Sequence, residues 1–159
     1  MDGLRWTERA MGMDEASWAR HANPWSGWTR LLTTPVLFLA VWSYVWIGWW
    51  ALAPIGVLAV WIYLNPRVFP PPRTTDAWMT KGALGERIFL ARAEQPIPDG
   101  HRRVGLFLTW LSVLVMGAGI VGFIMQDFWL AFWGVHTAGL IKVWFVDRMV
   151  WLYEETEGR

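Results

Sequence analysis

The sequence predicts an all-α membrane protein in which four transmembrane helices form two tight hairpins, with short interfacial helices on the cytoplasmic side. Hydrophobic residues make up 55% of the 159 residues and charged residues only 17%, which is too apolar for an ordinary soluble domain. Long uncharged runs can cross a bilayer, and Lys and Arg lie mostly outside them. We therefore expect residues 1–159 to form a single multi-pass domain in the cytoplasmic (inner) membrane.

Residues 1–30 read as a cytoplasmic amphipathic segment. They mix acidic and basic side chains with Trp and Met at spacings that one face of a helix can collect. The helix should end near Asn23-Pro24, because the residue before a proline is disfavoured in the helical region. Trp25 to Trp28 should then lie at the headgroup level. We expect no secretory signal peptide, since no short apolar core precedes a small-residue cleavage site.

The first apolar run, residues 31–64, is too long for one crossing. As a single helix it would measure about 51 Å, against a hydrocarbon core of roughly 30 Å. We predict a break at residues 47–49 and two spans, 31–46 and 50–64, with Pro54 near the start of the second. The alternative is one long tilted helix, or a helix kinked at Pro54.

Residues 65–103 are predicted to form a polar cytoplasmic connector. It opens with Asn65-Pro66 and the run Phe-Pro-Pro-Pro at residues 69–72, neither of which should continue a helix. A short helix with mixed apolar and charged side chains should follow and rest on the membrane surface, although Gly82 and Gly85 weaken that prediction. The basic residues at 101–103 should anchor the next span.

Residues 104–125 and 128–153 are predicted to form the second hairpin, with a tight turn at Gln126-Asp127. The first of these spans carries small residues, which let helix backbones approach closely in lipid. The candidate packing residues are Gly117, Gly119 and Gly122.

The positive charges predict the orientation. Of the 14 Lys and Arg residues, four precede the first span and seven lie in the connector, whereas the hairpin tips have none. The positive-inside rule then places both termini and the connector in the cytoplasm. Most of the 15 Trp residues fall near one of the two expected membrane boundaries, so aromatic belts explain them. The alternative is a porphyrin or sterol pocket walled by indoles.

The last span contains ionisable residues, and such a residue inside a membrane is a functional-site hypothesis. His136 and Asp147 lie on one helical face, along which a proton could pass. Alternatively, neutral His136 hydrogen-bonds to a neighbouring helix, for example through Ser43, Ser112 or a backbone carbonyl, and only fixes packing.

The other charges of this span should act as anchors. Lys142 is expected to extend its ammonium group to the inner headgroups. Asp147 and Arg148 are sequence neighbours and should not face each other, so each should find its own partner. The candidates for Asp147 are three arginines: Arg30, Arg102 and Arg103.

No pattern in the sequence indicates a cofactor or a metal. The chain has no cysteine, no His-x-x-x-His spacing, no phosphate-binding loop and no nucleophile elbow. The pI of about 8.2 and net charge of +1 do not indicate a nucleic-acid partner. The expected partners are the lipid bilayer and other integral-membrane proteins, or a second copy of the chain.

Four short segments carry a family resemblance: residues 21–26 (HANPWS), 76–82 (DAWMTKG), 84–87 (LGER) and 96–98 (PIP). They resemble recurring segments of a small family of uncharacterised prokaryotic integral-membrane proteins, a domain of unknown function. The resemblance covers nearly the whole chain and brings no activity with it. It implies a second candidate surface on the cytoplasmic side, formed by His21, Asn23, Trp25, Trp78, Lys81, Glu86 and His101.

Three functions follow from these observations. The first is a non-catalytic accessory or structural subunit that packs against a larger membrane complex through its glycine face. The second is a carrier or binder of a small apolar or protonatable ligand that uses the His136 face. The third is an enzyme with an inner-surface site among His21, Asn23, Glu86 and His101.

Overall fold

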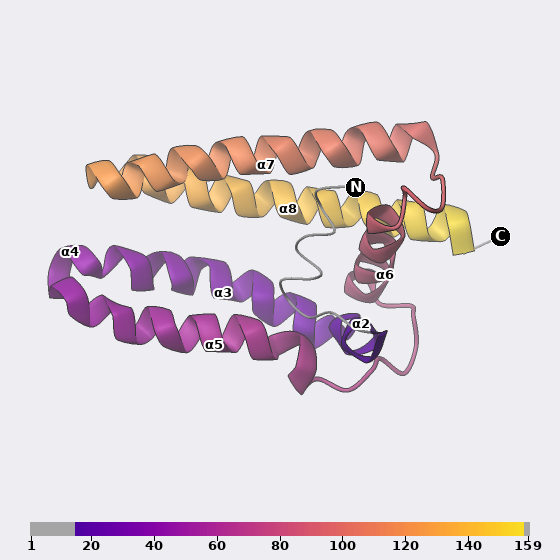
Figure 1. The fold of residues 1–159 in the computed structure, drawn as a ribbon, viewed down its shortest axis with the longest axis horizontal. Helices are drawn as coiled ribbons and strands as arrows, with labels where there is room; N and C mark the ends of the chain where they lie inside the picture. Colours follow the sequence, from indigo (N-terminus) through magenta and orange to yellow (C-terminus); the bar gives the residue numbers. More distant parts are fainter. Residues whose placement is uncertain (1–14, 158–159) are drawn as a thin grey trace.

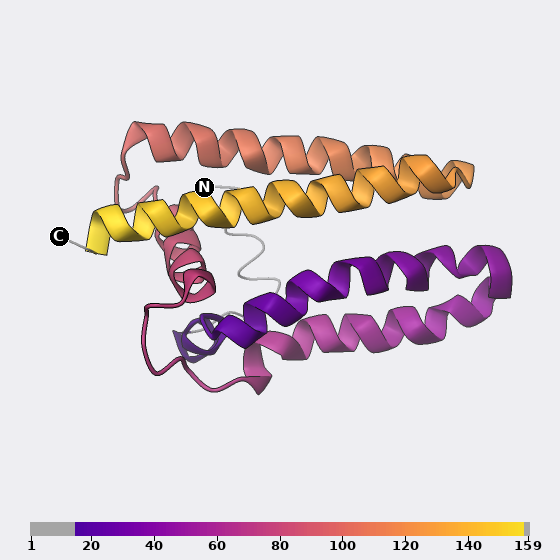
Figure 2. The ribbon, with the colours of Figure 1, turned by 180° about the vertical axis from the view of Figure 1, so that it is seen from behind.

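The computed structural model describes residues 15–157, and this part of the chain is all-helical, with 85% helix and no strand. Two long helical hairpins lie side by side, and two short helices gather at one end of the molecule (Figures 1 and 2). These short helices are α2 (Glu15–His21) and α6 (Trp78–Leu90), and we call this end the α6 end. Three helical stretches are long and apolar enough to cross a membrane: Pro24–Val68, Asp99–Met125 and Phe128–Glu157.

The first stretch folds back on itself. Helix α3 (Pro24–Trp42) and helix α5 (Leu52–Val68) lie side by side and run in opposite directions (Figure 1). The chain reverses through the short helices α4 (Tyr44–Ile47) and η1 (Gly48–Ala51). Gly48 has φ +57°, in the left-handed region that glycine adopts most readily. The reversal is therefore built around the glycine at which the sequence predicted a break.

Both helices extend beyond the predicted spans 31–46 and 50–64 at the α6 end, and both are shorter than predicted at the tip of the hairpin. The side chain of Asn23 accepts a hydrogen bond from the Trp25 backbone N–H at 2.9 Å, so Asn23 caps α3 and Pro24 is its first residue. Residues 25–28 are therefore the first turns of α3. At the same end of this hairpin, α5 continues through Pro66 to Val68. Pro66 lacks the N–H that would donate to the Ile62 carbonyl, and α5 ends two residues after it.

A ladder of polar side chains joins α3 to α5 near the α6 end. Ser26 Oγ donates to Asn65 Oδ1 at 2.8 Å, and Asn65 Nδ2 donates to Thr29 Oγ1 at 2.8 Å. Further along, Trp61 Nε1 donates to Thr33 Oγ1 at 3.2 Å. Ser26 and Asn65 are fully buried, so their polar atoms depend on these hydrogen bonds within the protein. This ladder fixes the register of the first hairpin.

The second hairpin consists of α7 (Asp99–Met125) and α8 (Phe128–Glu157). Gln126 takes a left-handed conformation with φ 55°, and Asp127 Oδ1 accepts from the Leu130 N–H at 3.0 Å, which starts α8. This turn is where the sequence predicted it. A small apolar cluster of Phe38, Trp42, Ala131 and Val135 joins the tips of the two hairpins.

Glycines let α7 and α8 approach closely. A Cβ atom on Gly122 would overlap the backbone of Ala131, and one on Gly119 would meet the Val135 nitrogen at 3.0 Å. A Cβ on Gly117 would meet nothing within 4 Å. Two of the three predicted packing glycines thus contact α8 of the same chain.

Helix α6 joins the two hairpins at its own end of the molecule. A Cβ on Gly85 would overlap the Met149 carbonyl of α8, and one on Gly82 would overlap the Val146 side chain. On the other side, Met79 of α6 fills the space above Gly27 of α3. The helix expected to rest on the membrane surface is therefore packed between α3 and α8. Its glycines are poor helix formers, but only they permit this crossing.

Candidate functional site

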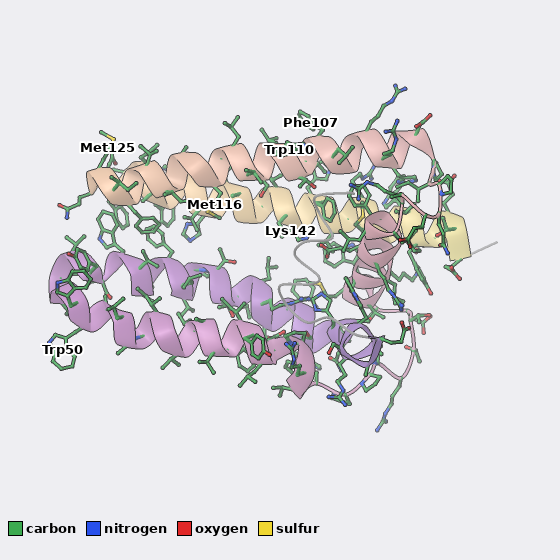
Figure 3. All side chains as sticks on the ribbon, viewed as in Figure 1. Trp50, Phe107, Trp110, Met116, Met125 and Lys142 are labelled. Atoms are coloured by element: carbon green, nitrogen blue, oxygen red, sulfur yellow. The ribbon has the colours of Figure 1, made fainter. Side chains whose placement is uncertain are left out.

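A cavity of about 260 Å³ lies at the α6 end, where α2, α3, α6 and α8 meet. One ionisable side chain from each of these helices lines it. These four residues are His21, Arg30, Glu86 and Lys142, and we call them the charged cluster. The remaining walls are mostly apolar and include Trp78 and Met79. Figure 3 labels Lys142 on the part of α8 beside α6 and α3.

Two features of the fold bring these four residues together from four helices. His21 ends α2, and the cap at Asn23 starts α3 immediately afterwards, so His21 and Arg30 lie on adjoining helices. Glu86 follows Gly85, the residue at which α6 crosses α8 most closely. The same crossing brings Glu86 to Lys142, whose Nζ lies 2.6 Å from Glu86 Oε1.

Glu86 is held as a carboxylate by its neighbours. Burial raises the pKa of Glu86, but the ammonium group of Lys142 and the nearby His21 and Arg30 lower it by more. The net result is a pKa below the ordinary value. Glu86 and Lys142 therefore form a charged pair, partly buried at Glu86 and half-exposed at Lys142.

His21 is neutral beside Arg30. Nη1 of Arg30 lies 2.6 Å from both ring nitrogens of His21, so the unprotonated nitrogen of a neutral imidazole accepts a hydrogen bond from the guanidinium. Burial, and then the charge of Arg30, lower the pKa of His21 to about 3. The charged cluster thus holds two cations, one carboxylate and one neutral histidine, and carries a net charge of +1.

Two of the three nitrogens of the Arg30 guanidinium have partners. Its Nε donates to the Ser26 carbonyl at 3.2 Å, and its Nη1 contacts His21. Within residues 15–157, Nη2 of Arg30 has no hydrogen-bond partner and no carboxylate forms an ion pair with the guanidinium. Arg30 is therefore a cavity-lining cation without a counter-charge in direct contact.

A second cavity, of about 330 Å³, lies between the two hairpins. Its lining is almost entirely apolar and comes from α3, α5, α7 and α8, including Leu37, Met116 and Val135. Arg30 and Thr34 line both this cavity and the charged one. The two cavities are thus neighbours along α3, and only the first holds the charged cluster.

The structure places three residues of the predicted cytoplasmic-side surface in the charged cavity and four elsewhere. His21, Trp78 and Glu86 line the cavity. Asn23 caps α3, and its Nδ2 donates to the Pro70 carbonyl at 2.8 Å, while Trp25 is exposed.

Lys81 and His101 contact carboxylates at the end of α8. Lys81 Nζ lies 2.6 Å from Glu154, and the hydrogen bond to this carboxylate raises the pKa of Lys81. His101 Nε2 lies 2.8 Å from Glu155. These two residues tie α6 and α7 to α8 and do not reach the cavity.

His136 lies in the aromatic cluster near the hairpin tips. Its Nδ1 donates to the Phe132 carbonyl at 2.8 Å, four residues earlier in the same helix. Its ring stacks on Phe132 at 4.2 Å between centroids and meets Phe38 edge-on at 5.2 Å. His136 therefore bonds within its own helix, whereas the sequence suggested Ser43, Ser112 or a carbonyl of a neighbouring helix.

Asp147 has different partners from those expected. Its Oδ1 accepts from Trp78 Nε1 at 3.3 Å, and its Oδ2 lies 3.5 Å from Arg148 Nη2. The expected pairing with Arg30, Arg102 or Arg103 was wrong, because Asp147 contacts Trp78 and Arg148 instead. Arg30 contacts His21, and Arg102 forms an ion pair with Asp99. The long side chain of Arg148 lets its guanidinium reach the carboxylate of Asp147, although the two residues are neighbours in the sequence.

Sequence reasoning missed Arg30 and Lys142 as site residues. Arg30 was considered as an orienting charge and as a partner of Asp147, and Lys142 was expected to reach the headgroups. The available signal was the position of Lys142 well inside a long apolar segment, where an ionisable residue points to a functional site. Among residues 15–157 no group of three or more His, Asp or Glu residues could hold a metal ion.

The neutral state of His21 makes stability depend on pH. The unfolded chain binds a proton near pH 6.5 and the folded chain only near pH 3, so stability falls as pH drops from 6.5 towards 3. Glu86 acts in the same direction below about pH 4.5, since folding lowers its pKa. Between pH 6.5 and pH 5 we expect a loss of about 1–2 kcal/mol from His21.

Thermal unfolding of the detergent-solubilised protein at both pH values measures this loss. His21→Gln should unfold at nearly the same temperature at pH 6.5 and pH 5. His101→Gln, which removes a histidine outside the cavity, should keep the pH dependence of the wild type. An equal pH dependence in all three proteins would contradict the buried, neutral state of His21.

Comparisons with known proteins place the chain in a family. No curated protein and no solved structure gives a significant match. Residues 5–158 match a family described as a family of unknown function, DUF6653. The match agrees with the expectation that an uncharacterised family covers nearly the whole chain. The chain therefore belongs to DUF6653, a family of unknown function.

Proposed function

We propose that this protein is a multi-pass inner-membrane protein that binds an amphiphile between its two hairpins. The polar end of the ligand occupies the charged cavity, and its hydrocarbon chain occupies the apolar cavity. The observation that carries the proposal is that Arg30 and Thr34 line both cavities. One site is thus polar at one end and apolar at the other, as an amphiphile is. The larger cavity lies within the range of roughly 300–1,000 Å³ typical of small-ligand sites.

The proposed topology has four crossings, by α3, α5, α7 and α8. The reversal at residues 43–51 supports a first stretch that crosses twice, because α3 and α5 lie side by side. The basic residues of the connector and of the region before the first span favour a cytoplasmic α6 end. In this topology the charged cluster lies near the cytoplasmic boundary, where a lipid headgroup would lie.

Amphiphile binding replaces the accessory-subunit hypothesis as our preferred function. One of the observations behind that hypothesis was a glycine face free to contact another protein. Gly119 and Gly122 contact α8 of the same chain, which leaves Gly117 as the only open residue of the three. The ligand-binding alternative is retained, but its site moves from the His136 face to the charged cluster.

Native mass spectrometry of the protein in a nonionic detergent tests this function with palmitate as the probe. The wild type should bind one palmitate. Thr34→Trp should abolish binding, because an indole at the junction would block passage between the two cavities. Val36→Trp, on the exposed side of the same helix, should bind palmitate as the wild type does. Equal binding by the two variants would contradict a ligand site between the hairpins.

A further inference from the structure

The chemistry of Arg30 defines the ligand's head more narrowly than the proposed function does. Its guanidinium is fixed by two contacts, through Nε to Ser26 and through Nη1 to His21. These contacts limit the orientations of its planar fork and leave Nη2 without a partner among the described residues. A guanidinium fork matches the geometry of a carboxylate or a phosphate oxygen pair.

The net charge of the charged cluster favours a ligand whose head group carries one negative charge. Lys142 and Glu86 neutralise each other at 2.6 Å, and His21 is neutral. Arg30 alone is left without a contacting counter-charge within residues 15–157. A partly buried, unpaired charge is costly, and one negative charge beside it removes that cost. A head with two negative charges would overcompensate, and a cationic head would be repelled.

We infer that Arg30 binds a singly charged oxyanion head, a carboxylate or a phosphodiester, on an amphiphile whose hydrocarbon chain runs along α3 into the apolar cavity. The inference rests on the proposed function. Within it, His21 is a positioning residue that orients the guanidinium. The pair Glu86–Lys142 closes the wall of the cavity on the α8 side.

Four amphiphiles with similar chains and different heads test this assignment by native mass spectrometry. They are palmitate, palmitoyl lysophosphatidylglycerol, hexadecanol and hexadecyltrimethylammonium. The wild type should bind the first two at least ten-fold more tightly than the last two. Acetate and inorganic phosphate should bind far more weakly than palmitate, because they lack the chain. If either bound as tightly as palmitate, the site would be one for free anions and the assignment would be wrong.

Variants of Arg30 test whether its side chain recognises the head group of the ligand. Arg30→Gln should reduce the preference for palmitate over hexadecanol by ten-fold or more and leave hexadecanol binding unchanged. Arg30→Lys should keep part of the preference, since it keeps the charge and loses the fork. The matched control Arg20→Gln removes an exposed arginine of α2 and should keep the full preference.

The outcomes separate this inference from the proposed function. If the wild type binds hexadecanol and palmitate equally well, the oxyanion assignment fails and amphiphile binding stands. If Arg30→Gln and Arg20→Gln show the same preference, the assignment fails as well. If none of the four amphiphiles binds, the proposed function fails and the assignment falls with it.

Discussion

Gly85→Ala is expected to destabilise the protein strongly and to abolish amphiphile binding. The added Cβ would overlap the backbone carbonyl of Met149, and a backbone atom cannot move away by changing rotamer. Helix α6 must then shift away from α8, and Glu86 moves with it. We expect a loss of about 1–3 kcal/mol in unfolding free energy. The shift should also break the 2.6 Å contact between Glu86 and Lys142.

Thermal unfolding in detergent and palmitate binding by native mass spectrometry measure the two effects. Gly100→Ala is the matched control, because a Cβ there meets nothing within 4 Å. It should leave both quantities close to those of the wild type. A Gly85→Ala variant that unfolds and binds like Gly100→Ala would show that α6 does not depend on close contact with α8.

The role of Gly85 explains why the sequence predicted α6 only in part. Gly82 and Gly85 argued against a helix, and by local propensity that argument was correct. The contacts that outweigh it come from Val146 and Met149, more than sixty residues later in the chain. The sequence pattern of the connector alone does not indicate these contacts with α8. An amphipathic pattern was therefore read as a surface helix, although the helix packs between two others.

Features with a local cause were predicted best. The turn at residues 126–127 and the glycine at position 48 break long apolar runs, and both breaks are visible in the sequence. The pair Asn23-Pro24 was read as the end of one helix, which is right for α2. The start of α3 at the same pair was not predicted. Asn is a favoured N-cap residue and Pro is favoured at the first helical position, so the pair also begins a helix.

The charged cluster could be predicted only in part. The family segments indicated His21 and Glu86, but nothing in the sequence linked them to Arg30 and Lys142, since the four lie on four different helices. Lys142 at the end of a flexible stem can reach either a headgroup or a carboxylate, and only the position of α6 decides between them. The cluster depends on the crossing at Gly85 and so on tertiary packing.

Alanine substitutions at two glycines of α7 should change the unfolding free energy in opposite directions. Gly122→Ala should lower the unfolding free energy by about 1–3 kcal/mol, because its Cβ would overlap the backbone of Ala131. Gly117→Ala should raise it by up to about 1 kcal/mol, since alanine favours the helix and its Cβ meets nothing within 4 Å.

Thermal unfolding of the two variants and the wild type in one detergent distinguishes the roles of these glycines. The expected order of unfolding temperatures is Gly117→Ala, then wild type, then Gly122→Ala. If both variants are stabilised, α7 and α8 do not approach as closely as Gly122 and Ala131 require. If both are destabilised, Gly117 also contacts a neighbour, and the accessory-subunit hypothesis regains its glycine face. Palmitate binding should change little in Gly117→Ala, because a Cβ there meets nothing within 4 Å and the cavity walls stay in place.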